Sequence, residues 1–117
     1  NRSTHEPAHR QGTVRAVGVV VGARRAEELV VWQLGTELRQ KVHAITAVGP
    51  AARDRRFCDQ IRDAASSVTR NIAEGFGRYG NREFARFLTI ARGSLFEVED
   101  QLRDGVARGY WDSATTK

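Results

Sequence analysis

From Glu27 onwards, apolar side chains recur at steps of three and four residues, the spacing that places them on one face of an α-helix. The first run predicts a helix that ends at Gly49-Pro50, because a glycine followed by proline stops a helix. Its apolar positions are Val31, Leu34, Leu38, Val42, Ile45 and Val48. Before this run, Thr13–Gly22 is rich in valine and glycine, which favours an extended conformation.

Two further helices follow with the same period. The second is predicted from about Arg53 to Glu74, with Gly75 as its C-terminal cap. The third is predicted from near Asn81 to about Arg108, where a glycine follows. The apolar positions of these two helices are Phe57, Ile61, Ala64, Val68 and Ile72, then Phe84, Leu88, Ala91, Leu95, Val98, Leu102 and Val106. In the third helix the steps alternate between four and three residues, which is typical of the seam of a left-handed bundle.

The predicted fold class is therefore all-α, an antiparallel up-down helical bundle with three helices in this chain. The predicted domains are an extended or disordered extension over residues 1–28, the bundle over residues 29–112 and a tail over residues 113–117. A unit of three such helices leaves part of its apolar seam exposed. We therefore expect it to need a partner chain or help from residues 13–24.

The chain has 117 residues, 19 of them Lys or Arg against 14 Asp or Glu, and a net charge of +5. Nearly all of these cations are arginines, which suit phosphate and carboxylate recognition better than lysines do; a GC-rich genome also tends to encode arginine. The single cysteine, Cys58, excludes an internal disulfide and fits a buried helical position. No run approaches the roughly 18 apolar residues of a membrane span, so a cytoplasmic protein without a membrane partner is expected.

Charge is unevenly distributed along the chain. Residues 53–92 hold nine arginines and five acids, whereas residues 93–112 hold two arginines and five acids. The candidate nucleic-acid-binding residues are the basic positions Arg55, Arg62, Arg70, Arg78, Arg82 and Arg86. A solvated helix face is the other interpretation of these arginines. A basic region and an acidic region also allow subunits to pack head to tail in a ring.

Phe96 indicates a contact of a different kind, because it points about 100° away from the apolar seam of the third helix at the usual helical rotation. A large aromatic side chain there faces a neighbouring helix or a neighbouring subunit, and we favour the subunit. Gly93 leaves space for close backbone approach nearby. The candidate oligomer interface comprises Gly93, Phe96, Asp100 and Asp104.

The glycines Gly75, Gly77 and Gly80 have the spacing of a dinucleotide-binding fingerprint. That motif requires a preceding strand, and the residues before Gly75 have helical period, so a Rossmann site is not expected. A flexible turn between helices is one interpretation. The other is a phosphate site at the start of the third helix, flanked by Arg78 and Arg82.

The sequence contains no recognisable set of catalytic residues. The possible nucleophiles lack a neighbouring base; they are Cys58, Ser66, Ser67 and Ser94. The acidic group Glu97, Glu99 and Asp100 lacks a histidine or a second carboxylate pair that would complete a metal site. His5 and His9 are four residues apart, but nothing predicts a helix there. We therefore expect no catalytic residues, no metal and no cofactor.

A family resemblance is carried by three motifs in order. The chain reads R-N-I-A-E-G-F-G-R over residues 70–78, E-F-A-R-F-L-T-I-A-R-G-S-L-F-E-V-E-D-Q-L over residues 83–102, and R-G-Y over residues 108–110. These resemble the N-I-A-E-G turn, the E-F-x-x-F-L-x-I-A-x-G-S-L helix and the closing G-Y of the 23S ribosomal RNA intervening-sequence proteins, also called four helix bundle proteins. The resemblance spans roughly residues 29–112.

Three departures from the family pattern accompany this resemblance. The family's fourth helix is missing after Tyr110, Gly80 stands where Ser or Thr is usual, and residues 1–28 have no counterpart. They point to a truncated or misregistered reading frame, or to a diverged member. The resemblance implies an all-α bundle that often forms a homopentamer, without an established enzymatic activity. It also implies kinship with the accessory proteins of diversity-generating retroelements, which bind a reverse transcriptase and nucleic acid through a basic surface.

Together these features indicate a non-enzymatic, self-assembling helical-bundle protein that binds RNA or a nucleic-acid enzyme through an arginine-rich surface. The alternative is a purely structural protein-interaction module whose arginines pair subunits. An enzyme such as a nuclease is a third hypothesis, and it lacks a metal or base constellation in the sequence.

Overall fold

The structure, a computed structural model, describes residues 26, 29–78 and 81–116. Within these ranges the chain forms helices and no strand, which confirms the predicted all-α class. The elements are α2 (Val30–Thr46), the 3-10 helix η3 (Pro50–Arg53), α3 (Arg55–Arg78), α4 (Asn81–Ala107) and the 3-10 helix η4 (Ser113–Thr116). The three predicted helices are therefore present in the predicted order.

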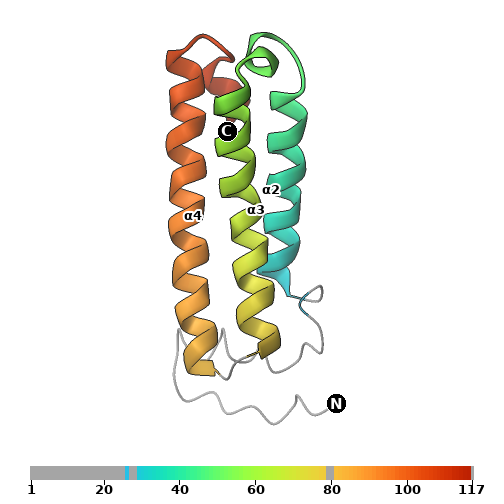
Figure 1. Cartoon of the computed structure of the whole chain (residues 1–117), viewed down its shortest axis with the longest axis vertical. Coiled ribbons are helices and arrows are strands. Elements are labelled where there is room, and N and C mark those ends of the chain that lie inside the picture. Colours follow the sequence, from blue (N-terminus) through green and yellow to red (C-terminus); the bar gives the residue numbers. More distant parts are fainter. Residues whose placement is uncertain (1–25, 27–28, 79–80, 117) are drawn as a thin grey trace.

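The three α-helices stand side by side and alternate in direction, with α3 in the middle (Figure 1). α4 has 27 residues and so extends for about 40 Å at the usual helical rise. Both α2 and α4 pack along α3. This is the antiparallel up-down arrangement that short connections between amphipathic helices favour.

Local capping explains where the helices begin and end. Asp54 precedes α3, and its Oδ1 accepts the Phe57 N–H at 3.1 Å, which satisfies one backbone donor of the first turn. Thr46 closes α2, and its hydroxyl donates to the Val42 carbonyl oxygen at 2.7 Å. Gly109 lies two residues after the end of α4 and has φ 81°, so the predicted glycine stop is confirmed there.

Gly75 does not end the second helix, contrary to the prediction. It is buried within α3, which continues to Arg78. A Cβ atom on Gly75 would lie 2.5 Å from Phe87 Cβ, so this glycine allows α4 to approach the backbone of α3. The packing of Phe87 there outweighs the roughly 1 kcal/mol by which glycine disfavours a helix interior. The N-I-A-E-G motif is accordingly helical rather than a turn.

The core has two parts. Toward the η3 end it contains Val42, Phe57, Ile61, Ala64, Ala65 and Val98. Toward the other end it contains Leu29, Val68, Ile72, Phe84 and Ala91. The predicted seam of α3 is buried throughout, because the three-four spacing turns it toward the neighbouring helices, whereas in α4 only Phe84, Ala91 and Val98 of the predicted seam are buried.

Two aromatic residues after α4, Tyr110 and Trp111, close the η3 end of the core. The Phe57 ring lies 5.2 Å from the Tyr110 ring and 5.8 Å from the Trp111 ring, centroid to centroid. The Trp111 indole N–H donates to the Leu102 carbonyl oxygen at 3.0 Å. Gly105 makes room for this indole, because a Cβ there would lie 2.2 Å from Trp111 Cζ2.

A polar network ties the same end together. The Arg108 guanidinium donates to Asp54 Oδ2 at 3.0 Å and to Asp104 Oδ2 at 2.8 Å. The Tyr110 hydroxyl also donates to Asp54 Oδ2. The hydrogen bond from Tyr110 lowers the pKa of Asp54, and the Phe57 N–H and Arg108 act in the same direction. The same bond raises the pKa of Tyr110, because a proton lost from its hydroxyl would leave two anions in contact.

Cys58 is buried, as predicted, and its thiol donates to the Ala51 carbonyl oxygen at 3.1 Å. Among the described residues, no helix combines the length and the apolar character that a membrane crossing needs.

Candidate functional site

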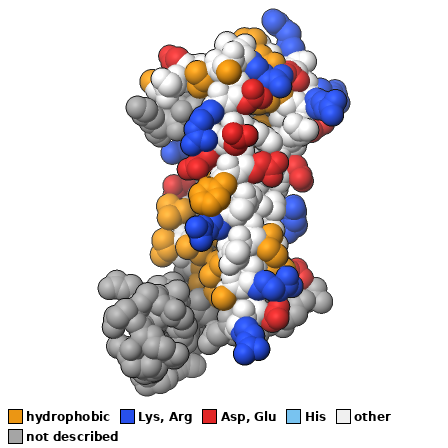
Figure 2. Space-filling model, turned by 90° about the vertical axis from the view of Figure 1, so that its left-hand side faces the viewer, with side chains coloured by type: hydrophobic (Ala, Val, Ile, Leu, Met, Phe, Trp, Pro, Cys, Tyr) orange, Lys and Arg blue, Asp and Glu red, His pale blue; other side chains and the backbone are white. Residues whose placement is uncertain are grey.

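The most apolar hollow on the described surface is a groove that runs between α2 and α4 over α3. We call it the apolar groove; its volume is about 370 Å³. Its main lining residues are Val31, Leu34, Leu38, Val68, Leu88 and Leu95. Arg92 is the one charged residue at its edge within the part of the chain that the structure describes. Figure 2 shows hydrophobic side chains exposed in a band on one face of the molecule.

The walls of the apolar groove are predicted core positions that remain exposed. Leu34 keeps 57% of its surface exposed, Val31 47% and Leu95 38%. The expectation that three helices leave part of their seam uncovered is therefore confirmed. α2 and α4 lie on different sides of α3, so neither covers the apolar stripe of the other.

Phe96 lies on α4 with 53% of its surface exposed, and the Arg92 guanidinium lies 5.4 Å from its ring centroid. A Cβ added at Gly93 would meet no atom within 4 Å. Asp100 is exposed as well, whereas Asp104 is engaged by Arg108 within the chain. The candidate interface residues thus lie on an outward face of α4, and a role between subunits stays a prediction.

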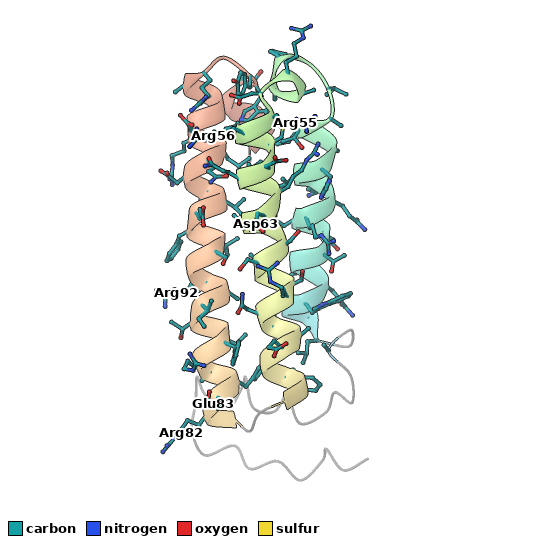
Figure 3. The ribbon with its side chains drawn as sticks, in the orientation of Figure 1. Arg55, Arg56, Asp63, Arg82, Glu83 and Arg92 are labelled. Atoms are coloured by element: carbon teal, nitrogen blue, oxygen red, sulfur yellow. The ribbon has the colours of Figure 1, made fainter. Side chains whose placement is uncertain are left out.

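The candidate nucleic-acid-binding arginines do not form one patch. Arg55 and Arg82 lie at opposite ends of the bundle (Figure 3). Arg62 is half-buried and its Nε donates to Thr46 Oγ1 at 2.8 Å, so it joins α3 to α2. Arg86 is exposed and pairs with Glu83 at 3.1 Å. Arg70 is exposed, and the side chain of Arg78 lies outside the described residues.

The antiparallel packing also changes the expected charge polarity. α4 does carry its outward arginines at the start and its outward acids toward the end. However, the arginines that open α3, Arg55 and Arg56, lie at the end of the bundle where α4 finishes (Figure 3), and Asp104 is in the last turn of α4. That end therefore mixes both signs, and the molecule does not divide into a basic end and an acidic end.

Sequence reasoning missed a second, smaller depression, which lies between α2 and α3. It has a volume of about 280 Å³. We call it the α2–α3 hollow; its lining residues are Trp32, Arg39, Ser66, Thr69, Arg70 and Ala73. The available signal was the spacing of Trp32 and Arg39, since residues seven apart share a helix face. Only the tertiary packing shows that Arg70 of α3 lies beside them.

The family comparison agrees with this architecture. A family model described as 23S rRNA-intervening sequence protein matches residues 27–117. The chain belongs to this family. The match covers all three α-helices, so the apolar groove and the α2–α3 hollow both lie within the family region. A search of curated proteins gave no match.

Polar residues inside this family bundle serve packing. The Ser67 and Ser94 hydroxyls lie 2.8 Å apart and join α3 to α4. Asn71 Nδ2 donates to the Ser67 carbonyl oxygen at 2.8 Å and lies 2.9 Å from Ser67 Oγ. No histidine or carboxylate takes part in these bonds, so the serines have no activating base in this network.

The remaining candidates are metal-ligating side chains and the glycine motif at the end of α3. Within residues 26, 29–78 and 81–116, no three His, Cys, Asp or Glu side chains group as metal ligands. His5, His9 and Gly80 lie outside the described residues. Gly75 and Gly77 belong to α3, and their φ values are not positive, so they do not form the flexible turn expected of a G-x-G-x-x-G loop.

Proposed function

We propose that this chain is a non-enzymatic, self-assembling helical-bundle protein of the 23S rRNA-intervening sequence type that binds RNA through exposed arginines. The apolar groove is the observation that carries the assembly. Its leucine and valine walls stay open to solvent, and exposed apolar surface of this kind marks an interaction site. In this proposal a second copy of the chain occupies the apolar groove and so forms an oligomer.

The RNA half of the proposal is supported by charge. The chain carries a net charge of +5, and Arg55, Arg70 and Arg82 are exposed. A guanidinium group binds phosphate through bidentate hydrogen bonds, and phosphate contacts make nucleic-acid binding depend steeply on salt concentration. A cytoplasmic RNA is the proposed partner; a nucleic-acid enzyme such as a reverse transcriptase is the other partner that the family kinship allows.

The assembly is tested by the solution mass of the full chain in multi-angle light scattering. We expect a defined oligomer that Leu34→Glu converts to a monomer, because a carboxylate in the apolar groove opposes its burial. Val48→Glu is the matched control. Val48 is 66% exposed and lies outside the apolar groove, so this variant keeps the oligomeric mass.

A wild-type protein that is monomeric at all concentrations contradicts assembly through the apolar groove. Deletion of residues 1–24 then tests whether residues 13–24 cover the apolar groove in place of a partner chain. If they fill the groove within one chain, the deletion raises the binding of a hydrophobic dye and creates an oligomer. The Leu34→Glu change in the full chain would then lower the unfolding midpoint without changing the mass.

A further inference from the structure

The α2–α3 hollow lies where α2 and α3 approach each other closely. Gly35 faces Thr69 across the two helices, and a Cβ on Gly35 would lie 2.8 Å from Thr69 Cγ2. This close approach sets Trp32 and Arg39 of α2 beside Arg70 of α3. Thr69 is buried and its hydroxyl donates to the Ser66 carbonyl oxygen at 3.2 Å, so the hydroxyl is satisfied locally.

The rim of the hollow carries two unneutralised positive charges. Arg39 and Arg70 are both exposed, and among the described residues neither forms an ion pair or a hydrogen bond. The acid nearest in sequence on α3 is Glu74, four residues beyond Arg70, and it has an interaction of its own. Two guanidiniums from different helices therefore border one depression without an acidic partner there, an arrangement that suits a phosphate.

The third element of the hollow is an aromatic surface. Trp32 packs against the core cluster that contains Val68 and Ile72, so its ring is held in place. It is only half-buried, and its remaining surface lines the hollow. An indole fixed beside unpaired guanidiniums combines a stacking surface with cations, which is how proteins hold unpaired bases and their backbone.

We propose that the α2–α3 hollow binds single-stranded RNA, with a backbone phosphate between Arg39 and Arg70 and a base stacked on Trp32. This inference rests on the RNA binding proposed above and gives it a location. The hollow lies on a different face of α2 from the apolar groove, because Trp32 and Arg39 are turned by about 100° from Val31 and Leu38. RNA binding and assembly therefore use different faces.

The test measures fluorescence anisotropy of a labelled ten-nucleotide oligouridylate with the full chain at low salt. We expect the double variant Arg39→Gln and Arg70→Gln to weaken binding about tenfold, and to reduce the salt slope by about 1.4 for two lost contacts with a single strand. The matched control is Arg53→Gln with Arg103→Gln. Both of these arginines are exposed and lie outside the hollow, so the control removes equal charge and weakens binding less than about threefold.

Tryptophan emission gives a second readout. We expect oligouridylate to quench the emission of the wild-type protein, because a base stacks on Trp32. In Trp32→Phe the quenching is lost, while Trp111, whose indole is tied to Leu102, still reports the folded state. Far-ultraviolet circular dichroism of each variant verifies that the helices remain.

The other outcomes separate the two proposals. Equal weakening by both arginine pairs overturns the hollow as the site and leaves RNA binding through diffuse charge. Absence of any binding by the wild-type protein at low salt overturns the RNA half of the proposed function itself. Tight binding of a labelled polyglutamate that needs Arg39 and Arg70, together with unquenched Trp32, assigns the hollow to an acidic protein partner instead and overturns the RNA assignment.

Discussion

At the residue scale, Asp54 joins three parts of the chain. It caps α3 through the Phe57 N–H and accepts hydrogen bonds from Arg108 and Tyr110, which lie beyond the end of α4. Its lowered pKa means that the folded state favours the ionised carboxylate. The stabilisation is therefore complete above the ordinary aspartate pKa of about 4, and it is lost as the pH falls through the lowered pKa of the folded state.

Asp54→Asn tests this network. We expect the urea midpoint of the variant to lie clearly below that of the wild type at pH 7, and the gap between them to close at acidic pH, where the wild-type carboxyl also becomes neutral. Asp59→Asn serves as the control, because Asp59 is exposed and forms no ion pair among the described residues. A gap that stays constant from pH 7 to pH 2 would show that the charge of Asp54 is irrelevant.

At the element scale, two glycines decide how closely the helices approach. Gly75 of α3 faces Phe87 of α4, and Gly35 of α2 faces Thr69 of α3. At each position a Cβ atom would collide with a side chain of the neighbouring helix. The short distance between the helices therefore requires glycine there. Periodicity alone marks neither position, because a glycine in a helical run also fits a helix end.

Gly75→Ala should lower the free energy of unfolding by about 1–2 kcal/mol, because the forced contact with Phe87 outweighs the gain in helix propensity. Gly77→Ala is the control in the same helix. Nothing lies within 4 Å of the position of its Cβ, so this change should be neutral or stabilising by up to about 1 kcal/mol. Chemical denaturation of both variants checks the difference in sign. Equal effects would mean that helix propensity alone governs both positions.

At the scale of the whole molecule, charge and apolar surface are separated. The apolar groove and the α2–α3 hollow lie on different faces of α2 and α3, and ion pairs such as Arg86 with Glu83 form within single helices. Surface pairs of this kind contribute little stability and are screened by salt. Assembly through the groove should therefore be insensitive to salt, whereas RNA binding should weaken steeply with it.

Arg82→Glu with Arg86→Glu distinguishes the scaffold from the alternative module whose arginines pair subunits. We expect light scattering to give an unchanged oligomeric mass, because the change reverses charge on an exposed helix start away from the groove. Both arginines also lie outside the α2–α3 hollow, so we expect RNA binding to weaken only through the lower net charge. Dissociation of the oligomer by this double variant, with RNA affinity intact, would favour the purely structural module.

The sequence by itself determined the all-α class, the order of three helices and most of the core, because a three-four spacing of apolar residues leaves a helix only one face to bury. It also identified the glycine stop at Gly109. Only the tertiary structure decided that α3 continues through Gly75 and that Arg62 turns inward to Thr46. It alone set Arg70 beside Trp32 and Arg39. These features depend on how two helices approach each other, and the period within one helix carries no information about its neighbour.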